Sequence, residues 1–270
     1  VAGSDTSGGA GIQADLRTFG WCGTWGVSVV SGVTAQTPHE LCAMAPVDTA
    51  TVEHQLQALL AWQPPAAAKS GMLASAAVAH TVATALADAG VPWVVDPLLR
   101  AGAGGALSTD ENALLHAYRS RVLPAAALVT PNVPEALAIL GREPGPPLDR
   151  RTLAGALYDR FGAVLLKGGH DAERPEEDLL VCDDGAWVLA APKLDPVQTH
   201  GTGCLLSAAI TAHLAHGRSL LEAAAKAKAY VWHLLAHPRR LADGDHVLLP
   251  GDHCREDVVT VTCWSRRTAT

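Results

Sequence analysis

The 270-residue sequence is poor in charged and aromatic side chains, which make up 17% and 4% of it. It carries 20 basic and 27 acidic residues, a net charge of −7, so it offers no general electrostatic attraction to nucleic acid or anionic membranes. No run of about twenty apolar residues is free of charge, proline and turn signals, which argues against a membrane-spanning helix. The first residues lack the basic and apolar stretches of a secretion signal. We therefore expect a cytoplasmic protein that binds neither nucleic acid nor membrane.

The six cysteines form no CxxC pair and no tight cluster. In a chain of this size without a secretion signal, they are expected to be reduced thiols. Twelve histidines are present, but none belongs to an HExxH pair or a comparable ligand arrangement. The sequence therefore argues against a metal site built from histidine or cysteine.

Apolar residues are plentiful by contrast: hydrophobic residues make up 49% of the chain, enough for a substantial core. The length fits one large domain or at most two small ones. Apolar runs typical of buried strands alternate with alanine-rich segments of helical period. The predicted strands span residues 27–33, 93–95, 126–129 and 163–166, and the predicted helices 49–60, 75–89, 109–119, 134–140, 153–161, 204–216 and 220–237. This alternation predicts an α/β layered domain with its ligand crevice at the carboxyl ends of the strands.

The strongest local motif is His200-Gly201-Thr202-Gly203-Cys204, directly before an apolar helical stretch. A glycine-rich turn that opens a helix presents unpaired N–H groups, which can hold the charge of a transferring phosphoryl group. An ordinary N-terminal cap, in which Thr202 satisfies these donors, explains the motif equally well. The helix dipole can lower the pKa of the Cys204 thiol and make it a base, but a small buried hydrophobic residue is the commoner role of cysteine.

A second glycine-rich run, Gly3-Ser4-Asp5-Thr6-Ser7-Gly8-Gly9-Ala10-Gly11, stands near the start of the sequence. No lysine follows its last glycine, so it is not a P-loop. Glycines at this density let the backbone approach a ligand closely, and a flexible turn is the alternative.

Four polar residues follow predicted strands at the edge where the crevice is expected: Asp96, Asn132, Glu135 and Lys167. A lysine can reach a nucleotide phosphate, and the oxygen-bearing side chains suit Mg²⁺. Each also has a simpler explanation, as a solvated lysine, a turn residue before proline or a first-turn charge of a helix. Together with the anion hole and the candidate base, they make up the set that phosphoryl transfer requires.

Seven segments of the sequence occur in the order typical of one known family. They are AGSDTSGGAGIQADL at residues 2–16, Thr34-Ala35-Gln36, Lys69-Ser70-Gly71-Met72-Leu73, Val95-Asp96-Pro97, Thr130-Pro131-Asn132 with Glu135, Leu166-Lys167-Gly168-Gly169-His170, and the motif at 200–204. By these segments the chain resembles the hydroxymethylpyrimidine/phosphomethylpyrimidine kinases of thiamine biosynthesis, within the ribokinase-like superfamily. The resemblance covers roughly residues 1–237.

The resemblance implies a three-layer αβα fold with a mostly parallel central sheet, formed by residues 1–240, and a divergent C-terminal tail at 241–270. It implies a kinase that uses ATP and Mg²⁺ to phosphorylate 4-amino-5-hydroxymethyl-2-methylpyrimidine and then the resulting monophosphate. A homodimer is the assembly that it suggests.

The resemblance also assigns a role to each candidate residue. Gln36 pairs with the aminopyrimidine edge, since an amide supplies both a donor and an acceptor. The pyrimidine pocket is lined by Gly3, Ala10 and Met72, with Asp15 beside them.

At the reacting end, Cys204 matches the base for the substrate hydroxyl, and the amides of Gly201, Thr202 and Gly203 match the anion hole. Lys167 matches the lysine near the nucleotide phosphates. The remaining matches, which organise Mg²⁺ and its waters beside the nucleotide, are Asp96, Asn132 and Glu135.

Two other functions stay open. Pyridoxal kinases share the fold, and many carry aspartate in place of Cys204, although some members with the cysteine also use pyridoxal. Gln36 favours the pyrimidine, with pyridoxal as a side activity, because hydrogen bonds to a substrate discriminate strongly between ring types. The other alternative is a non-catalytic sensor of pyrimidine or nucleotide, which would not need a base such as Cys204.

The sequence departs from the family at both ends. It begins at Val1, almost on the glycine-rich run, where family members have a short apolar strand, so we expect most of that strand to be absent. The nearest counterpart of the family's C-terminal Gly- and His-rich segment is Gly244-Asp245-His246 to Gly251-Asp252-His253. Residues 258–264 form either an extra edge strand or part of a disordered tail.

Overall fold

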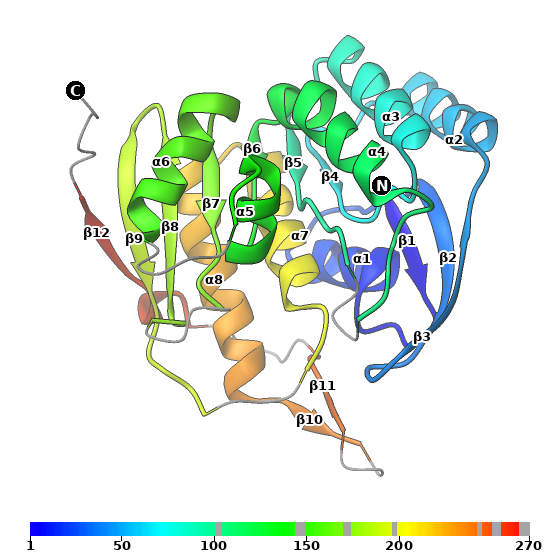
Figure 1. Ribbon diagram of the computed structural model, residues 1–270. Coiled ribbons are helices and arrows are strands. Elements are labelled where there is room, and N and C mark those ends of the chain that lie inside the picture. The colour runs from blue at the N-terminus through cyan, green and yellow to red at the C-terminus, as the bar shows by residue number, and fades with distance from the viewer. Residues whose placement is uncertain are drawn as a thin grey trace.

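A seven-stranded sheet crosses the structure, a computed structural model that describes residues 1–100, 104–143, 149–169, 174–195, 199–241, 245–249 and 255–264 (Figure 1). The strands are β1 (Ala2–Asp5), β2 (Val30–Gln36), β3 (Leu41–Pro46), β4 (Ala68–Ser70), β5 (Trp93–Val95), β6 (Leu128–Val129), β7 (Val164–Leu166), β8 (Glu177–Cys182), β9 (Gly185–Ala190), β10 (Arg239–Arg240), β11 (His246–Val247) and β12 (Thr260–Cys263). The order in the large sheet is β12-β9-β8-β7-β6-β5-β4, and a second sheet has the order β1-β2-β3.

The large sheet is mixed. Strands β4 to β7 pair in parallel, whereas β7-β8, β8-β9 and β9-β12 pair antiparallel. The expected mostly parallel sheet therefore corresponds to β4–β7. On the other side, the Val1 carbonyl accepts the N–H of Gly71 at 3.0 Å, so the start of β1 adjoins β4 and the second sheet continues the first (Figure 1).

The helices are α1 (Gly11–Trp21), α2 (Thr49–Trp62), α3 (Ala76–Asp88), α4 (Glu111–Ala117), α5 (Val133–Leu140), α6 (Arg150–Phe161), α7 (Thr202–Ala215) and α8 (Leu220–Ala236). A π-helical turn, η1 (Tyr118–Val122), and a 3-10 turn, η2 (Leu123–Ala125), follow α4, and another 3-10 turn, η3 (Glu256–Val258), precedes β12. None of the helices in the described ranges is long and apolar enough to cross a membrane.

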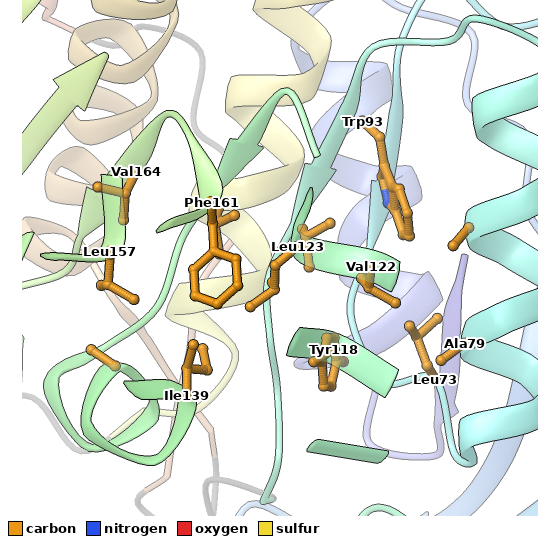
Figure 2. Close-up of a cluster of buried hydrophobic side chains, with 14 of the residues drawn as sticks. Leu73, Ala79, Trp93, Tyr118, Val122, Leu123, Ile139, Leu157, Phe161 and Val164 are labelled. Carbon is orange, nitrogen blue, oxygen red and sulfur yellow. The ribbon is translucent and has the colours of Figure 1, made fainter. Parts of the chain in front are cut away.

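Side chains of the central strands alternate between two cores. Trp93 and Val95 point to the core shared with α2–α6, whereas Val94 points to the core shared with α1, α7 and α8. Figure 2 shows the first of these cores, in which Trp93, Tyr118 and Phe161 gather between sheet and helices. Burial on both faces is the physical reason why these strands are continuously apolar and why the fold has three layers.

Most helices begin at a side-chain cap. The side chains of Asp48, Ser75, Asp110, Asn132, Asp149 and Ser219 accept first-turn N–H groups of α2, α3, α4, α5, α6 and α8, respectively. Helices α1 and α7, which begin at the two glycine-rich segments, have no such cap. Their first-turn N–H groups therefore remain available to other acceptors.

The predicted elements agree with the structure to within a few residues, and the α/β architecture is confirmed. Helix α1 was not predicted, because the glycines before it hide its start. The β8–β9 hairpin was not predicted either, although Asp183-Asp184-Gly185 is a turn signal. Of the two alternatives for residues 258–264, the edge strand is confirmed, since β12 pairs antiparallel with β9.

Gly168, directly after β7, generates a prediction about stability. A Cβ at Gly168 would lie 1.9 Å from the carbonyl oxygen of Glu177, whereas a Cβ at Gly169 would meet no atom of the described residues within 4 Å. We expect Gly168→Ala to lower the free energy of unfolding by about 1–3 kcal/mol, because the backbones must separate. Thermal unfolding of both variants measures the effect, with Gly169→Ala as the control. Equal losses in the two variants would contradict the packing argument.

Candidate active site

A cavity of about 1020 Å³ opens at the carboxyl ends of β1, β4, β5, β6 and β7. This is the edge at which the sequence predicted the crevice. The cavity is lined by every predicted site residue except Asp15, namely Gly3, Ala10, Gln36, Met72, Asp96, Asn132, Glu135, Lys167, Gly201, Thr202, Gly203 and Cys204. Residues as far apart in the chain as Gly3 and Cys204 thus meet in one place.

Lys167, Asp96 and Glu135 form a buried cluster in this cavity. The Lys167 ammonium donates to Oδ1 of Asp96 at 2.7 Å and lies 3.9 Å from Oε2 of Glu135. The other oxygen of Asp96, Oδ2, is buried and has no hydrogen-bond partner among the described residues. Burial raises the pKa of Glu135 to about 7, against the attraction of Lys167. An orphaned carboxylate oxygen here leaves room for a cation or a polar ligand group.

Asn132 and Glu135 have a structural role as well. The Asn132 side chain accepts the N–H of Glu135 at 2.8 Å, and the Glu135 carboxylate accepts the N–H of Asn132 at 2.8 Å. This capping box starts α5 and fixes both side chains at the cavity wall. Glu135 is therefore a charged residue in the first turn of a helix, as one interpretation of the sequence predicted. The capping box also orients its carboxylate toward Lys167.

The first turn of α7 faces the same cluster. Gly201 is the N-cap, with φ +84°, and no side chain caps the helix. The expected alternative of a Thr202 cap is therefore wrong. A Cβ at Gly201 would lie 2.0 Å from the Gly9 carbonyl oxygen, and one at Gly203 would lie 3.2 Å from Nζ of Lys167. Only glycine fits at position 201, and the first turn of α7 thereby lies against Gly9 and next to Lys167.

Cys204 lies in this first turn and is 6% exposed. Burial raises the pKa of its thiol, so the expectation of a lowered pKa is wrong. The Lys69 ammonium and the backbone N–H of Gly11 oppose this effect, whereas the charges of Asp15 and Asp96 reinforce it. Desolvation thus outweighs the helix terminus at this position.

The other end of the cavity is formed by Gly3, Met72 and Gln36. A Cβ at Gly3 would lie 2.7 Å from the sulfur of Met72, so a larger residue would close this pocket. The Gln36 side chain lies near the carboxylate of Asp5 and helps to lower its pKa. Asp5 also accepts the N–H groups of Ser7 at 2.9 Å and Ala10 at 2.7 Å. Burial favours a high pKa for Asp5, but Gln36 and the hydrogen bonds from Ala10 and Ser7 outweigh it, so its pKa is lowered.

Sequence reasoning missed several residues of the cavity. Asp5 was quoted in a motif without a role, although an aspartate two residues before a serine in a glycine-rich run is a turn signal. His200 lies 3.2 Å from Ser7, between Nε2 and Oγ, and burial lowers its pKa. His39 and Asp245 pair across the mouth at 2.8 Å. Asp245 and His246 line the cavity, whereas Gly244, residues 251–253 and His170 lie outside the described residues.

Asp15 does not line the cavity. Its carboxylate accepts two hydrogen bonds from Nζ of Lys69, at 2.8 and 2.9 Å, and both side chains are buried. Lys69, which does line the cavity, had been assigned no role. Lys69 is the central residue of β4, and its signal in the sequence is its place in the segment Lys69-Ser70-Gly71-Met72-Leu73.

Comparisons with known proteins agree with this geometry. The family described as phosphomethylpyrimidine kinase matches residues 5–248. The chain belongs to this family. It is 36% identical over 252 residues to the hydroxymethylpyrimidine/phosphomethylpyrimidine kinase of Haemophilus influenzae, covering 90% of this chain and 92% of that protein. The predictions of a ribokinase-like fold and of a kinase are confirmed.

Two solved structures are similar to the whole fold. Pyridoxal kinase from Staphylococcus aureus, in complex with AMP-PCP and pyridoxal, has a TM-score of 0.82 at 27% identity and covers 97% of each chain. Phosphomethylpyrimidine kinase from Clostridium difficile has a TM-score of 0.73 at 33% identity and covers 86% of this chain and 95% of that one. Sequence identity favours the pyrimidine kinase, and backbone superposition favours the pyridoxal kinase.

The raised pKa of Glu135 predicts a pH-dependent stability. Folded Glu135 holds its proton up to pH about 7, against an ordinary pKa of 4.5, so its ionisation costs stability as pH rises through that interval. We expect the melting temperature of Glu135→Gln, minus that of the wild type, to increase between pH 4.5 and 7 and then level off. Over this interval the free energy of unfolding of Glu135→Gln, relative to that of the wild type, should rise by a total on the order of 3 kcal/mol.

The matched control is Glu222→Gln, which changes the same position of the capping box on α8 at an exposed site. The pKa of Glu222 is lowered by hydrogen bonds from Ser219, so this variant gains nothing between pH 5 and 7. If the melting temperatures of Glu135→Gln and the wild type differ by the same amount at every pH, the pKa of Glu135 is not raised in the folded protein.

Proposed function

We propose that the protein transfers the γ-phosphoryl group of ATP to the hydroxymethyl group of 4-amino-5-hydroxymethyl-2-methylpyrimidine and then to the phosphate of the resulting monophosphate, in thiamine biosynthesis. One observation carries the proposal: the uncapped first turn of α7 meets Lys167 and Asp96 in the cavity that Gln36 and Cys204 also line. Membership of the phosphomethylpyrimidine kinase family supports the choice of substrate. We infer a cytoplasmic location from the same biosynthetic role.

At the end of the cavity formed by the first turn of α7 and Lys167, backbone N–H groups provide positive electrostatic potential without occupying the space that a side chain would fill. Gly201, Thr202 and Gly203 line the cavity, and a Cβ at Gly203 would lie 3.2 Å from the Lys167 ammonium, so we infer that their N–H groups face the phosphoryl group. Preorganised donors of this kind stabilise the charge on a transferring phosphoryl group, because they need no reorganisation in the transition state. Lys167 holds the nucleotide phosphates on the adjoining side, next to Asn132.

The acceptor end orients the hydroxymethyl group. Gln36 lines the cavity, where its side-chain oxygen can accept from the amino group of the pyrimidine. The substrate oxygen then attacks phosphorus as the bond to the ADP oxygen breaks, and the hydroxyl proton passes to Cys204. Cys204 must be a thiolate to accept this proton, which is why the charges around it matter.

Asp96 and Glu135 suit Mg²⁺. The fit to a cation is indicated by Oδ2 of Asp96, which is buried and has no hydrogen-bond partner in the described residues. The carboxylate of Glu135 lies on the same lysine, Lys167, and supplies a second set of oxygens. Within these ranges no three His, Cys, Asp or Glu side chains converge, so water and phosphate would supply the remaining ligands. When bound there, Mg²⁺ neutralises charge on the phosphate oxygens.

Pyridoxal phosphorylation is the second candidate, and the backbone similarity to S. aureus pyridoxal kinase favours it. Gln36 at the cavity wall favours the pyrimidine, because an amide can pair with a ring that carries an amino group next to a ring nitrogen. A non-catalytic pyrimidine or nucleotide sensor explains neither Cys204 nor the Lys167 cluster.

The decisive measurement is ADP release by the purified protein with ATP and Mg²⁺, using hydroxymethylpyrimidine, its monophosphate, pyridoxal and ribose. We expect turnover of both pyrimidines, with kcat/KM at least tenfold above that of pyridoxal. Turnover mainly of pyridoxal would keep the phosphoryl-transfer machinery and overturn the substrate. No turnover of any of the four would favour the sensor.

Two variants tie this activity to the site. Gln36→Met should reduce pyrimidine turnover far more than pyridoxal turnover, since only the pyrimidine loses a hydrogen-bond partner; equal losses would refute its role. Cys204→Ala should lower kcat at least a hundredfold while substrate affinity is retained, which is the size of effect typical of a lost general base.

We also propose that two copies associate through the outer face of the second sheet. Val33, which is 51% exposed, pairs with Ala45 across β2 and β3, and exposed Ala35 pairs with Ala43 on the same face. Light scattering after gel filtration should give a dimer for the wild type and a monomer for Val33→Glu. Val261→Glu, at an exposed valine of β12, is the control and should stay dimeric. A monomeric wild type at micromolar concentration excludes the assembly.

A further inference from the structure

Asp178 is a buried carboxylate on β8 that lines the cavity. Its Oδ1 accepts the backbone N–H of Gly168 at 2.7 Å, and its Oδ2 accepts from Nζ of Lys228 at 2.8 Å. Gly168 directly follows Lys167 after β7, and Lys228 lies on α8. One carboxylate thus joins the turn that follows the phosphate-binding lysine to a helix on the far side of the cavity.

The register of the sheet explains why Asp178 reaches this turn. Strands β7 and β8 pair antiparallel, and their paired residues end at Leu166 and Leu179. The same register carries Asp178 next to Lys167 and Gly168, where the ladder has stopped. The N–H of Gly168 is therefore bound by a side chain of β8 at a point where a strand would ordinarily supply a carbonyl.

Lys167 is held from both neighbouring strands. Its own N–H donates at 2.9 Å to the carbonyl of Pro131, which follows β6, whereas the next N–H donates to Asp178 on β8. Strands β6 and β8 are the two neighbours of β7 in the sheet. Bonds at two consecutive N–H groups fix the backbone from which the Lys167 side chain extends to Asp96.

A charged acceptor is an expensive way to satisfy one N–H group. Burying a carboxylate and an ammonium costs so much solvation that a neutral side chain would serve a purely structural purpose equally well. A carboxylate makes a shorter and stronger bond to an N–H group than a neutral oxygen does. Lys228 offsets its charge, and the strong bond restrains a turn in which two successive glycines would otherwise leave the backbone free.

We propose that Asp178, with its charge balanced by Lys228, is a positioning residue that fixes the backbone at Lys167 and so sets the place of the Lys167 ammonium for the nucleotide phosphates. The inference rests on the proposed function, in which Lys167 holds those phosphates. Its consequence is that Asp178 acts through Lys167, so its effect on nucleotide binding depends on the presence of that lysine.

The test uses a matched pair of variants of the full-length protein, Asp178→Asn/Lys228→Met and Asp178→Leu/Lys228→Met. Both lose the two charges, and only the first keeps an oxygen that can accept the N–H of Gly168. The dissociation constant of ADP with Mg²⁺ is measured by isothermal titration calorimetry. We expect the leucine form to bind ADP about tenfold more weakly than the asparagine form, a typical coupling between neighbouring residues.

Adding Lys167→Ala to both forms completes the cycle. If Asp178 acts through Lys167, the difference between the leucine and asparagine forms should then fall below about twofold. The same difference with and without Lys167 would mean that Asp178 contacts the nucleotide itself or only supports the fold, and it overturns the proposal. Equal ADP affinities of the asparagine and leucine forms overturn it as well.

The control is Asp183→Leu, in the turn at the other end of β8. This carboxylate accepts the hydroxyl of Tyr158 at 2.7 Å, so its loss also removes a hydrogen bond, and the affinity for ADP should stay unchanged. If the leucine double variant does not fold, the asparagine form decides. Lys167→Ala must weaken its ADP binding by the same factor as that of Lys228→Met, and a smaller factor overturns the proposal.

Failure of the inference and failure of the proposed function are distinguishable, because ADP binding requires no phosphoryl acceptor. A wild type that binds ADP and phosphorylates the pyrimidine, with no coupling between Asp178 and Lys167, keeps the kinase assignment and overturns the role of Asp178. A wild type that binds no ADP in the presence of Mg²⁺ overturns the proposed function and this inference with it.

Discussion

The close contact between two backbones, those of Gly9 and Gly201, is the constraint on which the site depends. A Cβ at Gly201 would lie 2.0 Å from the Gly9 carbonyl oxygen, so the two glycine-rich segments meet without intervening side chains. This contact brings the starts of α1 and α7 together, and these are the described helices that lack a side-chain cap. The starts of both helices, at Ala10 and Gly11 and at Gly201 to Cys204, therefore line one cavity.

Three lysines that line the cavity form ion pairs with carboxylates. Lys167 is shared by Asp96 and Glu135, Lys69 is held by Asp15, and Lys228 is held by Asp178. Each of these three lysines is thus already paired with a carboxylate before a substrate binds. The added potential for phosphate comes from backbone N–H groups, which carry no counter-ion and cost less to bury than a further lysine.

Local patterns predicted much of this protein. Apolar runs at β5 and β7 and alanine-rich periods at α3 and α8 appeared in the sequence as they occur in the structure, because both faces of the sheet are buried and the helices are long. The start of α1 and the β8–β9 hairpin were missed, since one follows a run of glycines and the other depends on pairing with β7. The sequence placed every proposed site residue except Asp15 at the cavity, but it predicted no role for Asp5 or Lys69.

The sequence by itself determined the family, the layered fold and the polar residues at the strand ends, because these follow from residue order, periodicity and chain reversal. Only the tertiary structure decided how those residues behave. It left α7 uncapped where Thr202 had been an alternative cap, moved Asp15 behind Lys69, and raised the pKa of Cys204 where a helix terminus alone would have lowered it. Burial and the distance to partner charges set these properties, and both depend on segments that are remote in the chain.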